Sequence, residues 1–307
     1  MDGHTAVLGI DVGGTQIKWA RWSPASGMLD QGRRATPRLD AAAVVDAVAD
    51  LIGGQPVNAV GVAVPGHLSD DLRAIRLIPN LPGDWSGLRF ADELEARTAM
   101  PVRLVNDARA FARAELQLGA ARGQDDVLFV TMGTGIGGAL ALNGRVLSAR
   151  GDAVGELGHM ICRPDGARCG CGAFGCLETV AGGSALVARV RAGGGRAETP
   201  ADVVGAAVRS DGLERAVLAD AGRALGLVLG NVIAYSSATT VVIGGGVAPA
   251  YEFMKQAVAA ELAARARLVG PVSVRPAHLG SGAGALGAAL MVAPHQTISN
   301  HLIDGDT

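Results

Sequence analysis

The sequence predicts an α/β protein made of two lobes with related architecture. Apolar, strand-like segments alternate along the chain with helical segments, which is typical of the α/β class. A unit of strand, glycine turn and strand occurs twice, as AVLGIDVGGTQIKWARW at residues 6–22 and as VLFVTMGTGIGGALALNGRVLS at residues 127–148. The length of 307 residues is sufficient for two such lobes.

The first of these units lies almost at the start of the chain. Its second strand alternates the apolar side chains of Ile17 and Trp19 with polar neighbours. The later unit repeats this plan, and its Asn143-Gly144 pair is typical of a type I′ hairpin. Helical patterns are predicted at residues 40–52, 86–97, 107–118, 200–209, 213–235, 250–268 and 283–292.

The boundary between the lobes is predicted where PVRLVNDARAFARAEL passes from a strand into a helix, with Asn106 or Asp107 as the cap. We therefore expect a small α/β lobe at residues 1–106 and a large α/β lobe at residues 107–282. The C-terminal helix and tail, residues 283–307, are expected to pack back on the small lobe. No Pro/Ser-rich linker marks the boundary, so the lobes should share an extensive hinge region.

Composition argues against binding to nucleic acid or to a membrane. Lys and Arg number 27 and Asp and Glu number 29, so the net charge of −2 provides no overall basic field. Apolar stretches such as ALGAALMVA at residues 285–293 are shorter than the ~20 residues that a membrane helix needs. The N-terminus also lacks the pattern of a secretory signal, and we expect a cytoplasmic protein.

All four cysteines lie within a short segment, HMICRPDGARCGCGAFGCLE at residues 159–178. Disulfides are rare in a reducing compartment, so clustered cysteines there indicate a metal site or a redox group. A redox pair usually has the spacing CxxC, whereas this segment contains CxC followed by another cysteine. One imidazole and three thiols match a closed, tetrahedral and structural zinc site in the loop 159–176, with Cys162 left over. The predicted ligands are His159, Cys169, Cys171 and Cys176.

Three glycine-rich loops are candidates for binding phosphate. DVGGT at residues 11–15 lies between two strands, and its amides could face a phosphate, although an ordinary hairpin turn would look the same. MGTGIGG at residues 132–138 has the GxGxxG spacing of a dinucleotide fingerprint, but a strand follows it where the fingerprint requires a helix. VVIGGGVAP at residues 241–249 could approach an adenosine or be a plain strand-to-helix turn, whereas GSGAGALGAAL at residues 280–290 favours close helix packing. The candidate phosphate-binding residues are Asp11, Gly13, Gly14, Thr15, Lys18, Gly133, Thr134, Gly135, Gly244, Gly245 and Gly246, and Asp11 could hold Mg²⁺ through water.

Taken in order, nine motifs resemble the ROK family of sugar kinases and sugar-responsive repressors, over most of the chain from about residue 8 to 292. The resemblance implies the actin-like ATPase (ribonuclease H-like) fold, with two α/β lobes closing over ATP and sugar. It also implies Mg²⁺, a structural Zn²⁺ and a homo-oligomer, either a dimer or a tetramer. The winged helix of the repressor members is not expected here, because the first phosphate loop already begins at Asp11. The motifs are GIDVGGT, GVAVPG, IPNLPGDW, LVNDA, TMGTGIGG, GELGH, the cysteine loop, GCLETVAGG and VVIGGG.

The same resemblance assigns roles to residues that would be unremarked singly. Asp107 matches the family's general base, although an isolated Asn-Asp pair before a helix would usually be a cap. Because a metal on one imidazole nitrogen fixes the direction of the other, zinc would aim a hydrogen bond from His159 at the sugar. The residues expected to bind the sugar hydroxyls are Asn80, Asn106, Glu156, His159 and Glu178, of which the glutamates could otherwise be solvated charges and Asn80 a turn residue.

Two departures from the family pattern concern the acceptor. Arg109 stands where family kinases commonly have asparagine, and Gly182 where they often have serine. We expect Arg109 to point to solvent; in the acceptor pocket it would change the pocket's charge and width. The sequence therefore predicts ATP-dependent phosphorylation of a hexose hydroxyl, the 6-hydroxyl of glucose first, with mannose, an N-acetylhexosamine or a cyclitol as other acceptors. Polyphosphate as the donor and a non-catalytic sugar sensor are the alternatives.

Overall fold

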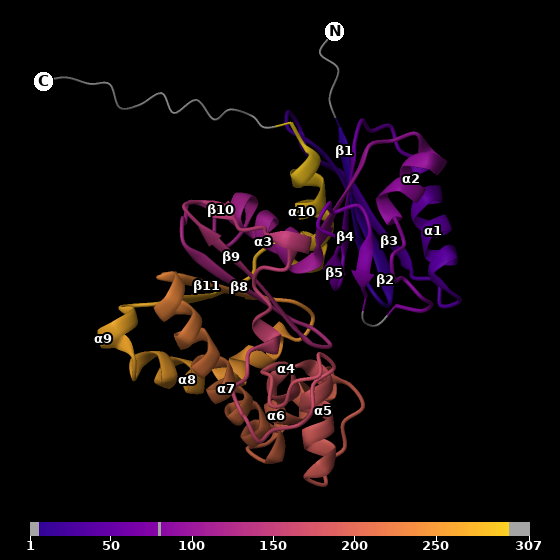
Figure 1. Ribbon diagram of the computed structural model, residues 1–307. Helices are drawn as coiled ribbons and strands as arrows, with labels where there is room; N and C mark the ends of the chain where they lie inside the picture. The colour runs from indigo at the N-terminus through magenta and orange to yellow at the C-terminus, as the bar shows by residue number, and fades with distance from the viewer. Residues whose placement is uncertain (1–5, 79–80, 295–307) are drawn as a thin grey trace, which may run out of the picture.

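The computed structural model describes residues 6–78 and 81–294, which form two five-stranded mixed sheets and a short hairpin (Figure 1). The first sheet has the order β3 (Gly27–Ala35), β2 (Gln16–Ser23), β1 (Val7–Val12), β4 (Val60–Val64), β7 (Val102–Asn106). The second has the order β10 (Arg145–Val146), β9 (Ile136–Leu142), β8 (Val127–Met132), β11 (Thr240–Gly244), β12 (Ser273–Pro276). The hairpin consists of β5 (His67–Leu68) and β6 (Ile75–Leu77).

The two sheets share one plan. In each, an antiparallel hairpin is followed on its other side by two parallel strands: β2 and β1 lead to β4 and β7, and β9 and β8 lead to β11 and β12. The predicted α/β class and the repeated unit are confirmed. Asn143 and Gly144 both have positive φ, 51° and 69°, as a type I′ turn between β9 and β10 requires.

Most of the predicted helices are present, with differences at their ends. The segment predicted as one helix at 250–268 is divided into a 3-10 turn and two helices, and the helix predicted from residue 86 begins at Phe90. The helices at 178–181 and 183–192 were not predicted, because the first has only four residues and Gly182 and Gly183 interrupt the helical pattern between them. The α-helices are α1 (Ala41–Gly53), α2 (Phe90–Thr98), α3 (Asp107–Leu118), α4 (Glu178–Ala181), α5 (Gly183–Ala192), α6 (Pro200–Arg209), α7 (Leu213–Ser236), α8 (Tyr251–Ala263), α9 (Ala266–Val269) and α10 (Ala283–Val292).

Helices α3 and α10 connect the two sheets. α3 and α10 pack on each other, and α10 also runs along β1 and β4 (Figure 1). One buried cluster joins α3 and α10 to the second sheet, with Phe111 meeting the ring of Phe129 edge-on at 6.2 Å between centroids. Another joins both helices to the first sheet through Ala63, Val105, Ala110 and Ala288. These two helices therefore form a packed connection between the sheets.

Glycines make this close packing possible. A Cβ at Gly61 of β4 would lie 2.0 Å from the carbonyl oxygen of Ala288 in α10, and one at Gly9 of β1 would lie 1.8 Å from that of Ala285. A Cβ at Gly287 would lie 1.7 Å from the carbonyl oxygen of Ala110 in α3. The expected role of this glycine-rich segment in close helix packing is confirmed.

Gly61→Ala should therefore destabilise the protein by at least about 3 kcal/mol, because the backbone of Ala288 in α10 occupies the space that the new methyl group needs. Gly53→Ala is the matched control, since a Cβ at this last residue of α1 meets nothing within 4 Å. Thermal unfolding of both variants checks this. A melting temperature of Gly61→Ala equal to that of the control would contradict the packing.

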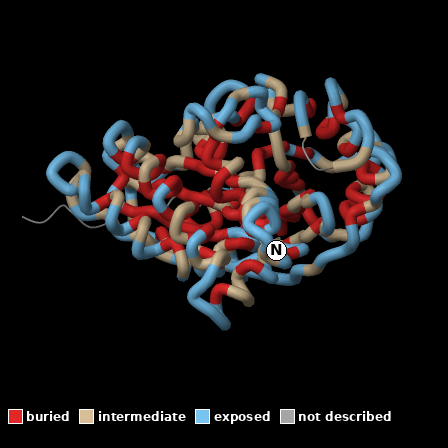
Figure 2. The backbone as a smooth tube through the Cα atoms, turned by 90° about the horizontal axis from the view of Figure 1, so that it is seen from below, coloured by how far each residue is buried: buried red, intermediate tan, exposed pale blue. Residues whose placement is uncertain are grey.

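Helix α7 is long and apolar enough to pass a composition test for a membrane span, with a mean hydropathy of 1.5 over its most apolar window. However, 61% of that window is buried inside the protein. Its side chains, among them Leu218, Leu225 and Leu229, belong to the largest buried cluster, and α8 packs along it. Burial in the core therefore accounts for the apolar character of this helix. Figure 2 shows buried segments, in red, running through the middle of the molecule.

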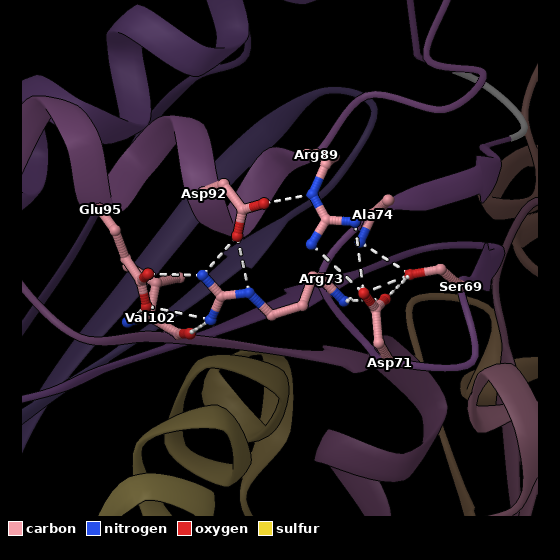
Figure 3. Close-up of polar contacts among 8 residues, drawn as sticks. All are labelled: Ser69, Asp71, Arg73, Ala74, Arg89, Asp92, Glu95 and Val102. Carbon is pink, nitrogen blue, oxygen red and sulfur yellow. Dashed lines mark hydrogen bonds and ion pairs between the residues drawn. The ribbon is translucent and has the colours of Figure 1, made fainter.

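An ion-pair network fixes the loop that follows β5 (Figure 3). The Arg73 guanidinium donates to Asp92 at 2.7 Å and to Glu95 of α2 at 3.1 Å, and also to the Val102 carbonyl oxygen at the start of β7. Arg89 contacts Asp92 and reaches Asp71, next to the turn made by Ser69. The network ties the β5–β6 hairpin to α2 and to β7, which ends at Asn106, directly before Asp107.

Candidate active site

Two carboxylates lie at one edge of the first sheet. β1, β4 and β7 are parallel, so their carboxyl ends meet at the same edge. Asp11 lies near the end of β1, and Asp107 directly follows β7 as the first residue of α3. The topology therefore brings together two acidic residues that are 96 positions apart in the sequence.

Asp107 has the properties of a proton acceptor at neutral pH. Burial, together with the negative charge of Asp11 and a smaller effect of Glu156, raises its pKa to about 7, while the Ala108 N–H and Arg109 act in the opposite direction. Its Oδ1 accepts a hydrogen bond from Ala108 N at 2.8 Å. Burial likewise raises the pKa of Asp11 to about 6, against the attraction of Lys18. A carboxylate whose pKa is close to the working pH is suited to general base catalysis.

Asn106 is the N-cap of α3 and is only 4% exposed. Its Oδ1 accepts from Ala108 N at 2.9 Å, and its Nδ2 donates to the Gly66 carbonyl oxygen at 2.9 Å. Its own N–H donates at 2.7 Å to Asp152, a buried residue that the sequence analysis missed. Asn106 and Asp152 thus both contribute hydrogen bonds at the start of α3. A direct contact of Asn106 with a sugar stays a prediction.

The expectation that Arg109 points to solvent is wrong. Its side chain is 3% exposed, and its Nη1 donates to Asn106 Oδ1 at 2.6 Å. Its Nη2 lies 3.3 Å from Oε1 of Glu156, whose side chain is 34% exposed. Helix α3 places residue 109 on the face that packs against the loop containing Glu156, and the Glu156 carboxylate is the partner of the arginine.

Hydrogen bonds fix the first glycine loop at Gly13, and the tip of the loop is exposed. Gly13 N donates to the Gln16 carbonyl oxygen, and Thr36 Oγ1 donates to the Gly13 carbonyl oxygen at 2.6 Å. Gly14 and Thr15 are exposed. Lys18, also predicted to bind phosphate, lies opposite Asp11 in the antiparallel pair of β1 and β2. The loop can therefore present amides and a hydroxyl to a ligand near Asp11.

The second glycine loop contacts Glu178. The Glu178 carboxylate accepts from Ile136 N at 3.1 Å, and a Cβ at Gly135 would lie 1.8 Å from its Oε2. Gly183 and Ser184, at the start of α5, donate to the carbonyl oxygens of Gly133 and Thr134. The structure thus brings the loop and the segment after the cysteines together, as their predicted common site requires.

The third glycine run is explained largely by packing. A Cβ at Gly244 would lie 2.5 Å from the ring of Phe111, and one at Gly245 would lie 2.3 Å from the Met132 carbonyl oxygen. Gly246 is exposed with nothing near its Cβ position. Contact between this run and a nucleotide stays a prediction, and Gly246 has the space for it.

The predicted metal ligands lie together. His159, Cys169, Cys171 and Cys176 each offer a ligand atom within 4.8 Å of the others. His159 Nδ1 is 3.5 Å from Cys169 Sγ, so its Nε2 is left for another partner. Burial and the neighbouring thiols raise the pKa of Cys176 to about 12, which makes the thiolate unfavourable. A bound cation would stabilise that thiolate. One imidazole and three thiols fit tetrahedral Zn²⁺.

Asn80, predicted to bind sugar, lies outside the described residues. The lobe boundaries at 106 and 282, the individual binding roles and the homo-oligomer likewise stay predictions. Cys162 lies outside the four-residue cluster, where its thiol is 3.6 Å from the Gly175 carbonyl oxygen.

Comparison with known proteins identifies the family of this chain. The model of the ROK family matches residues 7–295. The chain is 31% identical to a glucokinase of Halalkalibacterium halodurans over 93% of this chain and 94% of the relative. It is also 31% identical to an N-acetylmannosamine kinase of Yersinia pestis, over 92% and 97%. A ROK family glucokinase from Streptomyces griseus, solved in complex with glucose and AMPPNP, superposes with a TM-score of 0.79 at 29% identity, over 93% and 98% of the two chains.

Proposed function

Because this chain belongs to the ROK family and is a sugar kinase with the actin-like ATPase fold, we propose that it transfers the γ-phosphoryl group of ATP to the 6-hydroxyl of glucose. The observation that carries the proposal is the half-buried Asp107, with a pKa of about 7, at the sheet edge beside Asp11. The glucokinases among the relatives support glucose as the acceptor. The equal identity to an N-acetylmannosamine kinase makes N-acetylmannosamine the second candidate.

In this mechanism Asp107 takes the proton of the acceptor hydroxyl. Since its Oδ1 accepts from Ala108 N, its Oδ2 is the oxygen left for the hydroxyl. The sugar oxygen forms a bond to the γ-phosphorus as the bond between that phosphorus and the bridging oxygen of ADP breaks. The proton ends on Asp107 and is released to water after the sugar phosphate leaves.

The remaining residues position the reactants. The exposed amides of the first glycine loop and Lys18 would bind phosphate oxygens, and the second loop would oppose them from the other lobe. Mg²⁺, when bound, neutralises charge on the phosphates, and the Asp11 carboxylate is the group suited to hold it through water. Glu156, His159 and Glu178 would bind sugar hydroxyls.

The cysteine cluster has a structural part in this proposal. His159, Cys169, Cys171 and Cys176 would hold Zn²⁺, which would stiffen this segment without joining the reaction. His159, held through Nδ1, then directs Nε2 at a sugar hydroxyl.

A panel of acceptors tests the function. Glucose, mannose, fructose, N-acetylmannosamine and N-acetylglucosamine are each supplied with ATP and Mg²⁺, and ADP release and sugar phosphate are measured. We expect the highest kcat/KM with glucose, and lower values with polyphosphate in place of ATP. Tight sugar binding without turnover on any acceptor would instead identify a sensor.

The pH dependence of glucose phosphorylation should follow Asp107. Its pKa is raised to about 7, and the base works only when deprotonated. We therefore expect kcat/KM to fall about tenfold per pH unit below pH 7 and to level off above it. Steady-state rates between pH 5 and 9 check this, and a flat profile from pH 5 to 7 would contradict the assignment.

A further inference from the structure

Arg109 is a buried cation that touches two parts of the proposed acceptor site. Its contacts join Asn106, the cap of the helix that begins with Asp107, to Glu156 in the loop leading to His159. At 3% exposure it is too buried to reach a substrate itself. Any effect on catalysis must therefore pass through the groups that it holds.

The burial of the Arg109 side chain makes its contacts to Asn106 and Glu156 strong. Burying a guanidinium is costly unless its charge is paired and its N–H groups are bonded, and the Nε of Arg109 is buried without a partner. The two remaining nitrogens carry the contacts to Asn106 and Glu156, so the site strongly favours the geometry in which both are made. The Asn106 amide is already fixed by Gly66 and Ala108. Within residues 6–78 and 81–294, the Glu156 carboxylate has Arg109 as its one side-chain hydrogen-bond partner, so its orientation depends on Arg109.

We propose that Arg109 is a positioning residue for the sugar acceptor: it holds one oxygen of the Glu156 carboxylate and leaves the other directed at the sugar hydroxyls. The inference rests on the proposed function, in which Glu156 binds the sugar. Because Arg109 and Asp107 lie in the same helix, α3, this contact also fixes the sugar-binding carboxylate relative to the base. Losing it should therefore weaken sugar binding and leave ATP binding nearly unchanged.

The test is a double-mutant cycle of Arg109→Gln and Glu156→Gln, with KM for glucose, KM for ATP and kcat measured for each variant. Arg109→Gln should raise KM for glucose about tenfold, the loss of a charged hydrogen bond, and change KM for ATP by less than about twofold. Arg109→Lys should restore part of the glucose affinity, because it keeps the charge without the two-pronged geometry. The double variant should be little worse than Glu156→Gln alone.

Arg97→Gln is the control for losing an arginine, since Arg97 of α2 makes only exposed ion pairs, with Asp46 and Glu93. If Arg109→Gln does not fold, Arg109→Lys carries the test, with a rise in KM for glucose alone expected. Unchanged KM for glucose, equal rises for glucose and ATP, or additive effects in the cycle would each overturn the role of Arg109. An unchanged KM in Glu156→Gln would instead refute the proposed sugar contact of Glu156.

Discussion

Asp107→Asn should lower kcat for glucose phosphorylation by about 10²- to 10⁴-fold, because the amide cannot accept the hydroxyl proton. Asparagine has nearly the same shape, and its Oδ1 can still accept from Ala108 N. Glucose affinity, measured by calorimetry, should therefore stay within about threefold of the wild type. Substantial residual turnover would show that Asp107 is not the base.

The stability of this variant provides an independent control. The pKa of Asp107 is raised from 3.8 to about 7 in the folded protein. The native state therefore keeps a proton that the unfolded chain releases, and this stabilisation is complete below pH 4 and is lost as the pH rises through 7. Asp107→Asn, which carries no charge to bury, should unfold at a higher temperature than the wild type at pH 8 and at about the same temperature at pH 4. A lower melting temperature at pH 8 would mean that the loss of turnover reflects damage to the fold.

Cys171→Ser should abolish stoichiometric zinc and raise KM for glucose by about tenfold or more, since a metal bound at this cluster would direct His159. Cys171 is exposed, so the substitution leaves no buried cavity. Zinc content by mass spectrometry of the metal, the melting temperature and KM for both substrates check this. KM for ATP should change less, because the glycine loops do not contain zinc ligands.

Cys162→Ser is the matched control. Cys162 lies in the same segment but outside the four-residue cluster, so this variant should keep zinc and glucose affinity. Loss of zinc from Cys171→Ser with unchanged KM for glucose would contradict the link between the metal and His159. Loss of zinc from Cys162→Ser would show that the metal site includes Cys162.

Local sequence patterns predicted much of the fold. The alternation of Ile17 and Trp19 and the Asn143-Gly144 turn are short-range signals, and both predicted hairpins are present. The cluster of His159 and three cysteines could also be predicted, because its four residues lie within eighteen positions and this set of side chains is typical of a metal site. The break between α8 and α9 was missed, since Ala264 and Arg265 are good helix formers and tertiary contacts decide the end of the helix.

The surroundings of Asp107 were harder to predict. Asp152 and Glu156 reach the start of α3 from more than 40 residues away, and Gly66 does so from another strand's end. Nothing near Arg109 in the sequence distinguishes an arginine pointing to solvent from one paired with a distant carboxylate. The resemblance identified the position as unusual, and only the folded arrangement showed its partners.

We propose that the phosphoryl group passes directly from ATP to a hydroxyl whose proton Asp107 accepts. ATP made chiral at the γ-phosphorus with oxygen isotopes, turned over with glucose, tests it most directly. A single in-line displacement inverts the configuration at phosphorus in the glucose 6-phosphate, and this is the predicted result. Retention of configuration would reveal two displacements through a phosphorylated residue and would contradict direct transfer from ATP to the hydroxyl that Asp107 deprotonates.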